Sequence, residues 1–290
     1  MQINDATIDL SLYPKRSSTE TISPFRYPGG KGFLSGYFAN VFEDFETGPK
    51  HYAEPFCGGA GSAWNLLADQ KVDEIHLNDA DIRIYSAWKA ILHENDRFCE
   101  RLSDVTVDIE TWNAARSLLT NYSGKAYDFE LGFATYFVNR TSRAGIILGS
   151  GPIGGYKQAG DWKMDARFYR ETMLKRIKWI GSQKRRVKLK NQEALTFLKG
   201  AAKRLPIART LYFVDPPYVQ AGGRLYLNAM TEKKHRALGE YLKSDILKHW
   251  ILTYDDDPLI REIYRGRHFS KLAVNYSLSR IRKESEVLVR

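Results

Sequence analysis

Short apolar runs alternate with amphipathic stretches over most of this chain, and the alternation predicts an α/β fold. The runs are rich in β-branched and aromatic residues, as strands are, and the stretches between them carry the three-to-four-residue apolar spacing of helices. The predicted strands lie at the start of 51–62 and at 71–79, 187–190, 211–214, 250–254, 271–276 and 287–290. The predicted helices lie at 33–42, 63–68, 82–92, 109–119, 127–138, 166–180, 194–203, 232–242 and 258–264. Repeated alternation of this kind is typical of a doubly wound sheet.

The alternation is interrupted between the second and third predicted strands. Residues 84–186 hold several predicted helices, a glycine-rich stretch at 149–160 and a basic run at 184–186. We therefore expect an inserted, mainly helical region at 84–186, with residues 1–83 and 187–290 forming the main domain. Residues 1–23 are polar with few periodic signals, which predicts a flexible lead.

The strand predicted at 211–214 is followed directly by Asp-Pro-Pro-Tyr at 215–218. Proline has no N–H to donate, so the strand must end there. Ligands of open α/β sheets bind at the carboxyl ends of the strands. Asp215 and the nearby carbonyl groups are hydrogen-bond acceptors, and Tyr218 offers a flat ring. Such groups suit a planar amine, for example the exocyclic nitrogen of a nucleobase.

Two glycine-containing loops lie upstream of this strand. Tyr-Pro-Gly-Gly-Lys at 27–31 ends on a lysine but lacks the first glycine and the Ser/Thr of a P-loop. Glu-Pro-Phe-Cys-Gly-Gly-Ala-Gly-Ser at 54–62 lies between a predicted strand and a predicted helix, as in the first unit of a nucleotide-binding domain. It is not the dinucleotide fingerprint, which disfavours NAD.

An acidic residue closes the second predicted strand. Asp79 lies roughly 20 residues beyond the glycines, where a carboxylate can accept hydrogen bonds from ribose hydroxyls. Asp79 could instead cap the helix predicted at 82–92, and Asp81 is a competing choice for the ribose.

Charge and composition narrow the function further. The 290 residues include 44 Lys and Arg against 34 Asp and Glu, a net charge of +10, which favours a polyanionic partner over a generic basic surface. No apolar run approaches the roughly 18 residues of a membrane span, and the N-terminal residues lack the pattern of a secretory signal. The 2 cysteines have no metal-site spacing. We expect a reduced, cytoplasmic protein with no membrane association and no metal site.

The motifs together resemble one enzyme family. Asp-Pro-Pro-Tyr at 215–218 is similar to the catalytic motif of adenine-N6 DNA methyltransferases. The segment 27–31 resembles the N-terminal cofactor motif of their Dam-like (alpha) group, and 54–62 resembles the loop that binds S-adenosylmethionine (AdoMet). Asn-Arg-Thr at 139–141 resembles the stretch that opens that group's DNA-contacting hairpin. The resemblance extends from about residue 23 to the end of the chain.

This resemblance implies an AdoMet-dependent methyltransferase-type sheet, with the last two strands as an antiparallel edge hairpin and a target-recognition region at 84–186. It implies a monomeric enzyme that transfers a methyl group from AdoMet to the N6 amino group of an adenine flipped out of double-stranded DNA. The implied catalytic residues are Asp215, Pro216, Pro217 and Tyr218, where Asp215 and the Pro216 carbonyl accept the amine N–H bonds and Tyr218 stacks on the base. The implied cofactor contacts are Tyr27, Lys31, Phe56, Gly58, Asp79, Glu193 and Asp215. The candidate DNA contacts are Arg140, Arg143 and Lys157.

Alternatives remain at this stage. We expect Lys157 to touch phosphate and leave open whether Arg140 and Arg143 read bases, with Arg143 the favoured base reader; the run at 184–186 is a second candidate DNA surface. An RNA adenine methyltransferase would share the chemistry, although the large basic insert favours DNA. A catalytically idle DNA-binding protein is disfavoured by the intact motif at 215–218.

Overall fold

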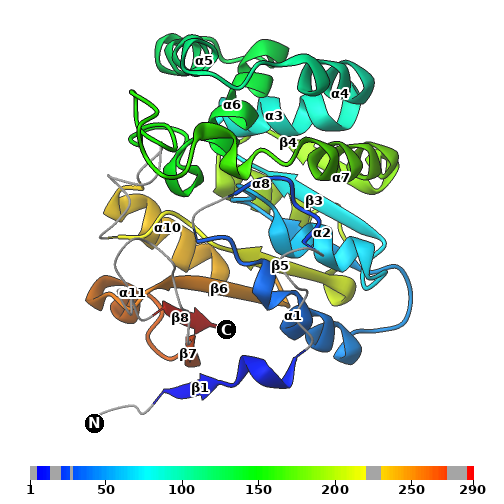
Figure 1. The fold of residues 1–290 in the computed structure, drawn as a ribbon. Coiled ribbons are helices and arrows are strands. Elements are labelled where there is room, and N and C mark those ends of the chain that lie inside the picture. The colour runs from blue at the N-terminus through cyan, green and yellow to red at the C-terminus, as the bar shows by residue number, and fades with distance from the viewer. Residues whose placement is uncertain (1–4, 14–20, 27–28, 220–229, 273–285) are drawn as a thin grey trace.

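A single mixed sheet forms the centre of the molecule in the computed structural model, which describes residues 5–13, 21–26, 29–219, 230–272 and 286–290. Its eight strands have the order β1-β7-β8-β6-β5-β2-β3-β4 (Figure 1). The strands are β1 Ala6–Ile8, β2 His51–Glu54, β3 Glu74–Asn78, β4 Val187–Lys190, β5 Thr210–Val214, β6 Trp250–Asp255, β7 Phe269–Leu272 and β8 Glu286–Val289. Neighbours pair in parallel except β6–β8 and β7–β8, which are antiparallel.

Helices cover both faces of this sheet. The helices are α1 Ser35–Val41, α2 Gly61–Ala68, α3 Ile82–His93, α4 Asn95–Asp104, α5 Ile109–Asn121, α6 Phe129–Thr141, α7 Arg170–Ser182, α8 Ala194–Ala202, α10 Glu232–Leu242 and α11 Pro258–Ile263. Successive side chains of a strand point to opposite faces. On β5, Leu211 and Phe213 therefore join the core beneath α1 and α2, whereas Tyr212 and Val214 join the core beneath α8, α10 and α11. The predicted doubly wound α/β sheet is confirmed.

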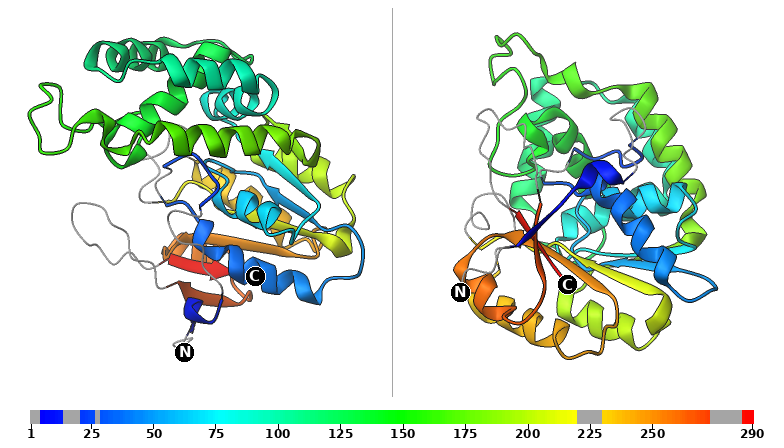
Figure 2. Two further views of the ribbon diagram at one scale, coloured as in Figure 1. Left: turned by 45° about the vertical axis from the view of Figure 1, so that its right-hand side comes forward. Right: turned by 90° about the horizontal axis from the view of Figure 1, so that it is seen from below.

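The chain between β3 and β4 forms a layer of helices, although these two strands pair directly. Figure 1 and the left view of Figure 2 show α3 to α7 stacked beyond one side of the sheet. Within the layer α3 packs against α6 and α7, and α5 packs against α6. Asp108 and Asp128 cap α5 and α6 by accepting from backbone N–H groups. Helix α4 was not predicted because its apolar face consists of only Phe98, Cys99 and Leu102 in a polar sequence.

The prediction of a flexible lead at residues 1–23 is wrong for part of the N-terminal segment. Instead of belonging to a flexible lead, Ala6–Ile8 form β1, which pairs in parallel with β7, and the Asp5 carboxylate lies 2.5 Å from the Arg261 guanidinium. The β7–β8 pair is antiparallel as expected, but it is not the sheet edge, because β1 lies outside β7. A three-residue strand is too short for its two-residue period to show in a sequence.

The last predicted strands are shifted slightly. The strand expected at 271–276 begins at Phe269, and its residues from 273 onward lie outside the described part of the chain. Among the described helices, none is both long and apolar enough to span a membrane.

Candidate active site

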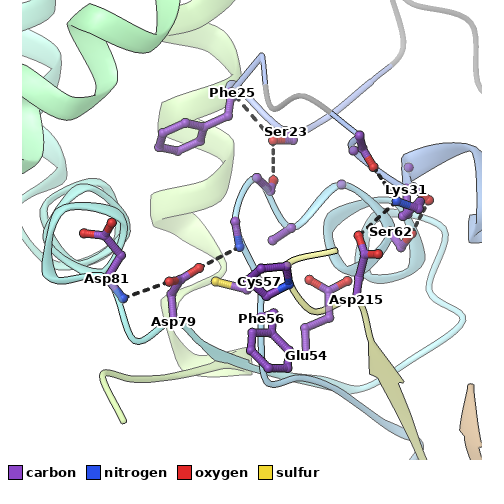
Figure 3. A pocket seen from close by; sticks show the side chains of 18 of the residues that line it. Ser23, Phe25, Lys31, Glu54, Phe56, Cys57, Ser62, Asp79, Asp81 and Asp215 are labelled. Atoms are coloured by element: carbon purple, nitrogen blue, oxygen red, sulfur yellow. Dashed lines mark hydrogen bonds and ion pairs between the residues drawn. The ribbon is translucent and has the colours of Figure 1, made fainter. Parts of the chain in front are cut away.

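A pocket of about 590 Å³ opens where β2, β3 and β5 end. Its volume lies in the range of about 300–1,000 Å³ that is usual for small-molecule sites. Figure 3 shows Asp79 and Asp81 on one side of the pocket and Lys31 with Asp215 on the other, with Phe56, Cys57 and Glu54 between them. The lining residues come from segments within 21–33, 54–65, 79–81, 145–148, 193–194 and 213–217, together with Met230 and Lys234.

The glycine-rich loop after β2 forms the middle of the pocket wall. The Gly58 N–H donates to Asp79 Oδ2 at 3.0 Å, and the Trp88 indole N–H donates to the Gly58 carbonyl at 2.7 Å. A Cβ at Gly61 would come within 3.2 Å of the Gly32 backbone, so glycine lets the two predicted loops pack together. The Ser62 hydroxyl also donates to the Lys31 carbonyl at 2.5 Å. The structure therefore brings the segments around 31 and 58 into one site.

Two carboxylates lie at the end of β3. Asp79 accepts from the N–H groups of Gly58 and Asp81, and burial raises its pKa to about 7. Asp81, rather than Asp79, caps α3: its Oδ1 accepts from the backbone N–H and the Nε–H of Arg83. The other carboxylate oxygen of Asp81, Oδ2, is buried and has no hydrogen-bond partner. Both residues line the pocket, so both alternatives for the ribose contact remain compatible with the geometry.

On the opposite side, a buried lysine joins the Asp-Pro-Pro-Tyr motif. The side chain of Lys31 is 3% exposed, and its ammonium donates to Asp215 Oδ2 at 3.1 Å and to the Tyr218 hydroxyl at 2.8 Å. Glu286 Oε1 on β8 lies 3.4 Å from the same ammonium, and the Tyr218 hydroxyl donates to this oxygen. The charge of Lys31 thus meets the Asp-Pro-Pro-Tyr motif, a contact that the sequence did not suggest.

Asp215 is held on both of its oxygens. The Thr253 hydroxyl donates to Oδ1 at 2.6 Å, while Lys31 occupies Oδ2. Burial raises the pKa of Asp215, the Lys31 charge lowers it, and the neighbouring Glu286 raises it. The carboxylate is therefore fixed in orientation at the end of β5, and the charge of Lys31 opposes the rise in its pKa that burial causes.

The Tyr218 side chain is buried and anchored through its hydroxyl. The residue is only 8% exposed, and its ring packs beside Tyr254 with 6.5 Å between the ring centroids. Since Lys31 and Glu286 both bind its hydroxyl, Tyr218 links these two groups, and its expected stacking on the base stays a prediction. Pro217, its neighbour, does line the pocket.

The three candidate DNA contacts have different environments. Arg140 is 7% exposed, and its guanidinium donates to the backbone carbonyls of Pro24 and Arg167. The expectation that Arg140 touches DNA is therefore corrected: its donors hold two chain segments together. Arg143 and Lys157, in contrast, are exposed on the glycine-rich side of the helical layer.

The Asn-Arg stretch joins the helical layer to the pocket wall. The Asn139 side chain accepts from the Arg26 N–H at 2.9 Å and donates to the carbonyls of Arg26 and Gly145 at 3.0 and 2.7 Å. Gly145 has φ +73°, and a Cβ there would come within 1.8 Å of the Arg26 carbonyl oxygen. This close approach places Ile146 to Leu148 on the pocket wall.

Most of the other predicted site residues line the pocket or lie at the end of β5. Phe56 and Gly58 line the pocket. Glu193 also lines it while capping α8, where its Oε2 accepts from Leu195 and Thr196. Pro216 is buried at the end of β5. Tyr27 lies outside the described residues.

Three functional candidates were missed by sequence reasoning: Thr253, Glu286 and Glu54. Thr253 carried a usable signal, because it lies near the end of a predicted strand parallel to the one that ends at Asp215. Glu286 carried none, since its strand reaches the site only through the antiparallel pairing of β8. Glu54 stood in the glycine-loop motif but was not assigned a role.

The buried carboxyl group of Glu54 should make the stability of the fold depend on pH. Burial raises its pKa to about 8, although the Tyr52 hydroxyl donates to it at 2.9 Å. Because the folded-state pKa is raised, this group favours folding most below its ordinary pKa, and that stability is lost as the pH rises through about 8. Glu54→Gln removes this loss. We therefore expect the free energy of unfolding of the variant, relative to that of wild type, to be higher at pH 9 than at pH 6 by more than about 1 kcal/mol. Urea unfolding at both pH values measures the difference, and an unchanged difference would contradict it.

Comparison with known proteins agrees with this geometry. The family model described as D12 class N6 adenine-specific DNA methyltransferase matches residues 27–278. Two solved structures of the rRNA methyltransferase aviRa from Streptomyces viridochromogenes share 14% and 12% identity over 100% and 99% of this chain and 94% and 96% of theirs. Their TM-scores are 0.35 and 0.38. No curated protein matches the sequence. Because the family match covers most of the chain, the protein belongs to the D12 class N6 adenine-specific DNA methyltransferases.

Proposed function

We propose that this enzyme transfers a methyl group from AdoMet to the N6 amino group of an adenine that is flipped out of duplex DNA. The observation that carries the proposal is one pocket that holds both the glycine-rich loop and the fixed carboxylate of Asp215. Family membership supports the adenine specificity. Since the N6 atom of a paired adenine lies inside the duplex, the base has to leave the stack to reach such a pocket.

The residues of the pocket fit AdoMet. The glycine-rich loop leaves room for close backbone approach, and Phe56 and Glu193 line the same cavity. Asp79 and the unpartnered Oδ2 of Asp81 offer acceptors for ribose hydroxyls. We propose that Gly58, Phe56, Asp79, Asp81 and Glu193 hold the cofactor. When bound, AdoMet supplies an electrophilic methyl group on its sulfonium.

The chain's own contribution to the reaction centres on Asp215. The lone pair of an adenine amine is conjugated into the ring and is a poor nucleophile. We propose that Asp215 and the Pro216 carbonyl accept the two N–H bonds of the amine, which favours a pyramidal nitrogen and stabilises the positive charge that develops on it. Lys31 and Thr253 hold the carboxylate of Asp215 in place. In this role Lys31 is a positioning residue.

We further propose that residues 84–186 form the target-recognition region. The layer joins the pocket directly, because Asn139 binds the Arg26 backbone and Ile146 to Leu148 line the cavity. Arg143 and Lys157 are exposed on the same region.

One prediction concerns the cofactor side of the pocket. Asp79→Ala and Asp81→Ala each remove an acceptor, and we expect each to raise the Kd for AdoMet by about tenfold, since a hydrogen bond to a charged group contributes about 1.5–3 kcal/mol. DNA affinity should change less. Isothermal titration calorimetry measures the AdoMet Kd, and Asp69→Ala, a carboxylate at the end of α2 that does not line the pocket, serves as the control. Unchanged affinity in both variants would remove these residues from the site.

A second prediction concerns the DNA surface. If Lys157 touches phosphate, Lys157→Ala should weaken binding to all duplexes equally and reduce the salt slope by about one. If Arg143 reads a guanine edge, Arg143→Ala should cost roughly 1–3 kcal/mol at one base position and relax the sequence preference. Binding across a salt series on cognate and scrambled duplexes separates the two. Unchanged affinity and slope in both variants would favour 184–186 as the DNA surface.

The function as a whole is tested by following tritium from labelled AdoMet. Long-read sequencing of DNA from cells that express the chain first maps the methylated adenines, and duplexes with that sequence then serve as substrates. We expect label in duplex DNA at N6 of adenine and enhanced 2-aminopurine fluorescence when that analogue replaces the target base. Label in RNA alone would support an RNA methyltransferase, and binding without transfer would support an idle DNA-binding protein.

A further inference from the structure

Two histidines and a glutamate meet at the end of the sheet that faces away from the pocket. His51 begins β2, Glu74 begins β3, and His76 lies two residues farther along β3. His51 pairs with Glu74 in the parallel register, so all three side chains lie on the same face of the two strands. His51 and Glu74 begin the two strands whose other ends lead to the pocket residues Glu54 and Asp79.

The separations of their ligand atoms match a metal centre. His51 Nδ1 lies 3.1 Å from His76 Nε2, and Glu74 Oε2 lies 3.9 Å from the first nitrogen and 3.7 Å from the second. Ligands at about 2.0–2.2 Å from a tetrahedral zinc ion stand about 3.3–3.5 Å apart, so a small adjustment converts the observed triangle into three ligand positions. Among the described residues, His51, Glu74 and His76 form the group of His, Cys, Asp or Glu side chains whose ligand atoms lie close enough together to share one metal ion.

The types of ligand atom in this cluster indicate which metal ion it would bind. Imidazole nitrogen suits zinc and its first-row neighbours, whereas calcium and magnesium prefer oxygen ligands. The histidine side chains are 15% and 9% exposed, and that of Glu74 is 34% exposed, which leaves a solvent side for a water as fourth ligand.

Charged side chains near the cluster lower its affinity for a metal ion. Lys188 Nζ lies 3.7 Å from Glu74 Oε1, the oxygen that does not face the imidazoles. Arg204 and Arg209 add positive charge near His76 and His51, and Asp73 adds negative charge near His51. These cations weaken the binding of a dication, so removal of Lys188 should strengthen it.

We propose that His51, His76 and Glu74 form a zinc-binding site that ties the start of β2 to the start of β3. The sequence predicted no metal site, because the three residues have no recognised motif spacing and come together only through strand pairing. In this position the ion does not take part in methyl transfer. It stabilises the two strands whose far ends carry Glu54 and the turn to Asp79.

The test uses the untagged, full chain freed of metal by a chelator and titrated with Co²⁺, a visible stand-in for zinc. We expect a d–d absorption band that saturates at one equivalent and is removed by Zn²⁺, and a Tm higher by about 5 °C at a hundredfold excess of Zn²⁺ over its Kd. His51→Gln and His76→Gln should each weaken Co²⁺ binding by more than about a hundredfold, beyond the effect of an outer-shell change. Lys188→Met should tighten it severalfold.

His93→Gln is the matched control, because His93 is exposed on α3 and should leave binding unchanged. A band that persists in both histidine variants, or no saturable band, would show that the close His51–His76 contact is a hydrogen bond only. If the histidine variants do not fold, X-ray absorption of zinc-loaded wild type decides the question. Two imidazole ligands per zinc support the site, and one or none overturns it.

Discussion

Replacement of Asp215 by alanine is expected to lower the rate of adenine methylation by at least a hundredfold, while AdoMet binding is weakened but remains measurable. The side chain stands at the end of β5 in the pocket wall, held by Thr253 at 2.6 Å and by Lys31 at 3.1 Å. In the proposed mechanism it accepts an N–H bond that strengthens as charge develops on the amine. Loss of such a transition-state interaction costs about 2.7 kcal/mol or more, which is a hundredfold in rate.

Single-turnover transfer of tritium to a cognate duplex measures this rate, and calorimetry measures the AdoMet Kd. Asp256→Ala is the control: this carboxylate follows β6, the neighbouring strand, but it binds Arg261 and does not line the pocket. We expect the control to retain its rate within about threefold. An Asp215→Ala enzyme that also stays within threefold of wild type would refute the catalytic assignment.

Replacement of Lys31 by methionine is expected to destabilise the fold by about 3 kcal/mol, because it leaves the carboxylates of Asp215 and Glu286 buried without their cation. The side chain of Glu286 is 1% exposed and that of Asp215 is 20% exposed, so solvent screens this change only weakly. Methionine keeps the length of the side chain and removes its charge.

The same substitution should move the pH dependence of catalysis. Lys31 lowers the pKa of Asp215 against the effect of burial, so its loss raises that pKa further. In the proposed mechanism the reaction needs the ionised carboxylate of Asp215, so the acid limb of the rate profile should shift to higher pH. A purely structural lysine would change stability without this shift, so the rate profile distinguishes a positioning role from a packing role.

Two further variants make this result specific. Lys31→Met combined with Glu286→Gln removes one of the stranded charges and should recover part of the lost stability. Lys234→Met removes an exposed lysine of the same pocket and should change stability by less than about 0.5 kcal/mol. Urea unfolding measures all of them, and equal stability of Lys31→Met and wild type would show that Lys31 does not compensate these carboxylates.

The fold was largely readable from the sequence. The apolar runs at 211–214 and 250–254 lie within β5 and β6. The glycine-rich loop and Asp-Pro-Pro-Tyr follow the ends of β2 and β5, where ligands of α/β sheets bind. These features are local: an apolar run, a proline stop or a glycine turn acts over a few residues. The adenine methyltransferase family that these motifs resembled is confirmed by the family match. The short strand β1 and the polar helix α4 lacked a periodic signal long enough to detect.

What each charged side chain does was decided by the tertiary structure. Arg140 and Arg143 are three residues apart and of the same type, yet the first is buried against the carbonyls of Pro24 and Arg167 and the second is exposed. Lys31 meets Asp215 across 184 residues of sequence, and His51 meets His76 through strand pairing. The sequence by itself determined the longer strands, the glycine-rich loop and the residue types at the sheet edge. Only packing between distant segments determined which charges face the pocket and which are neutralised inside the protein, because burial and pairing depend on neighbours that the local pattern does not specify.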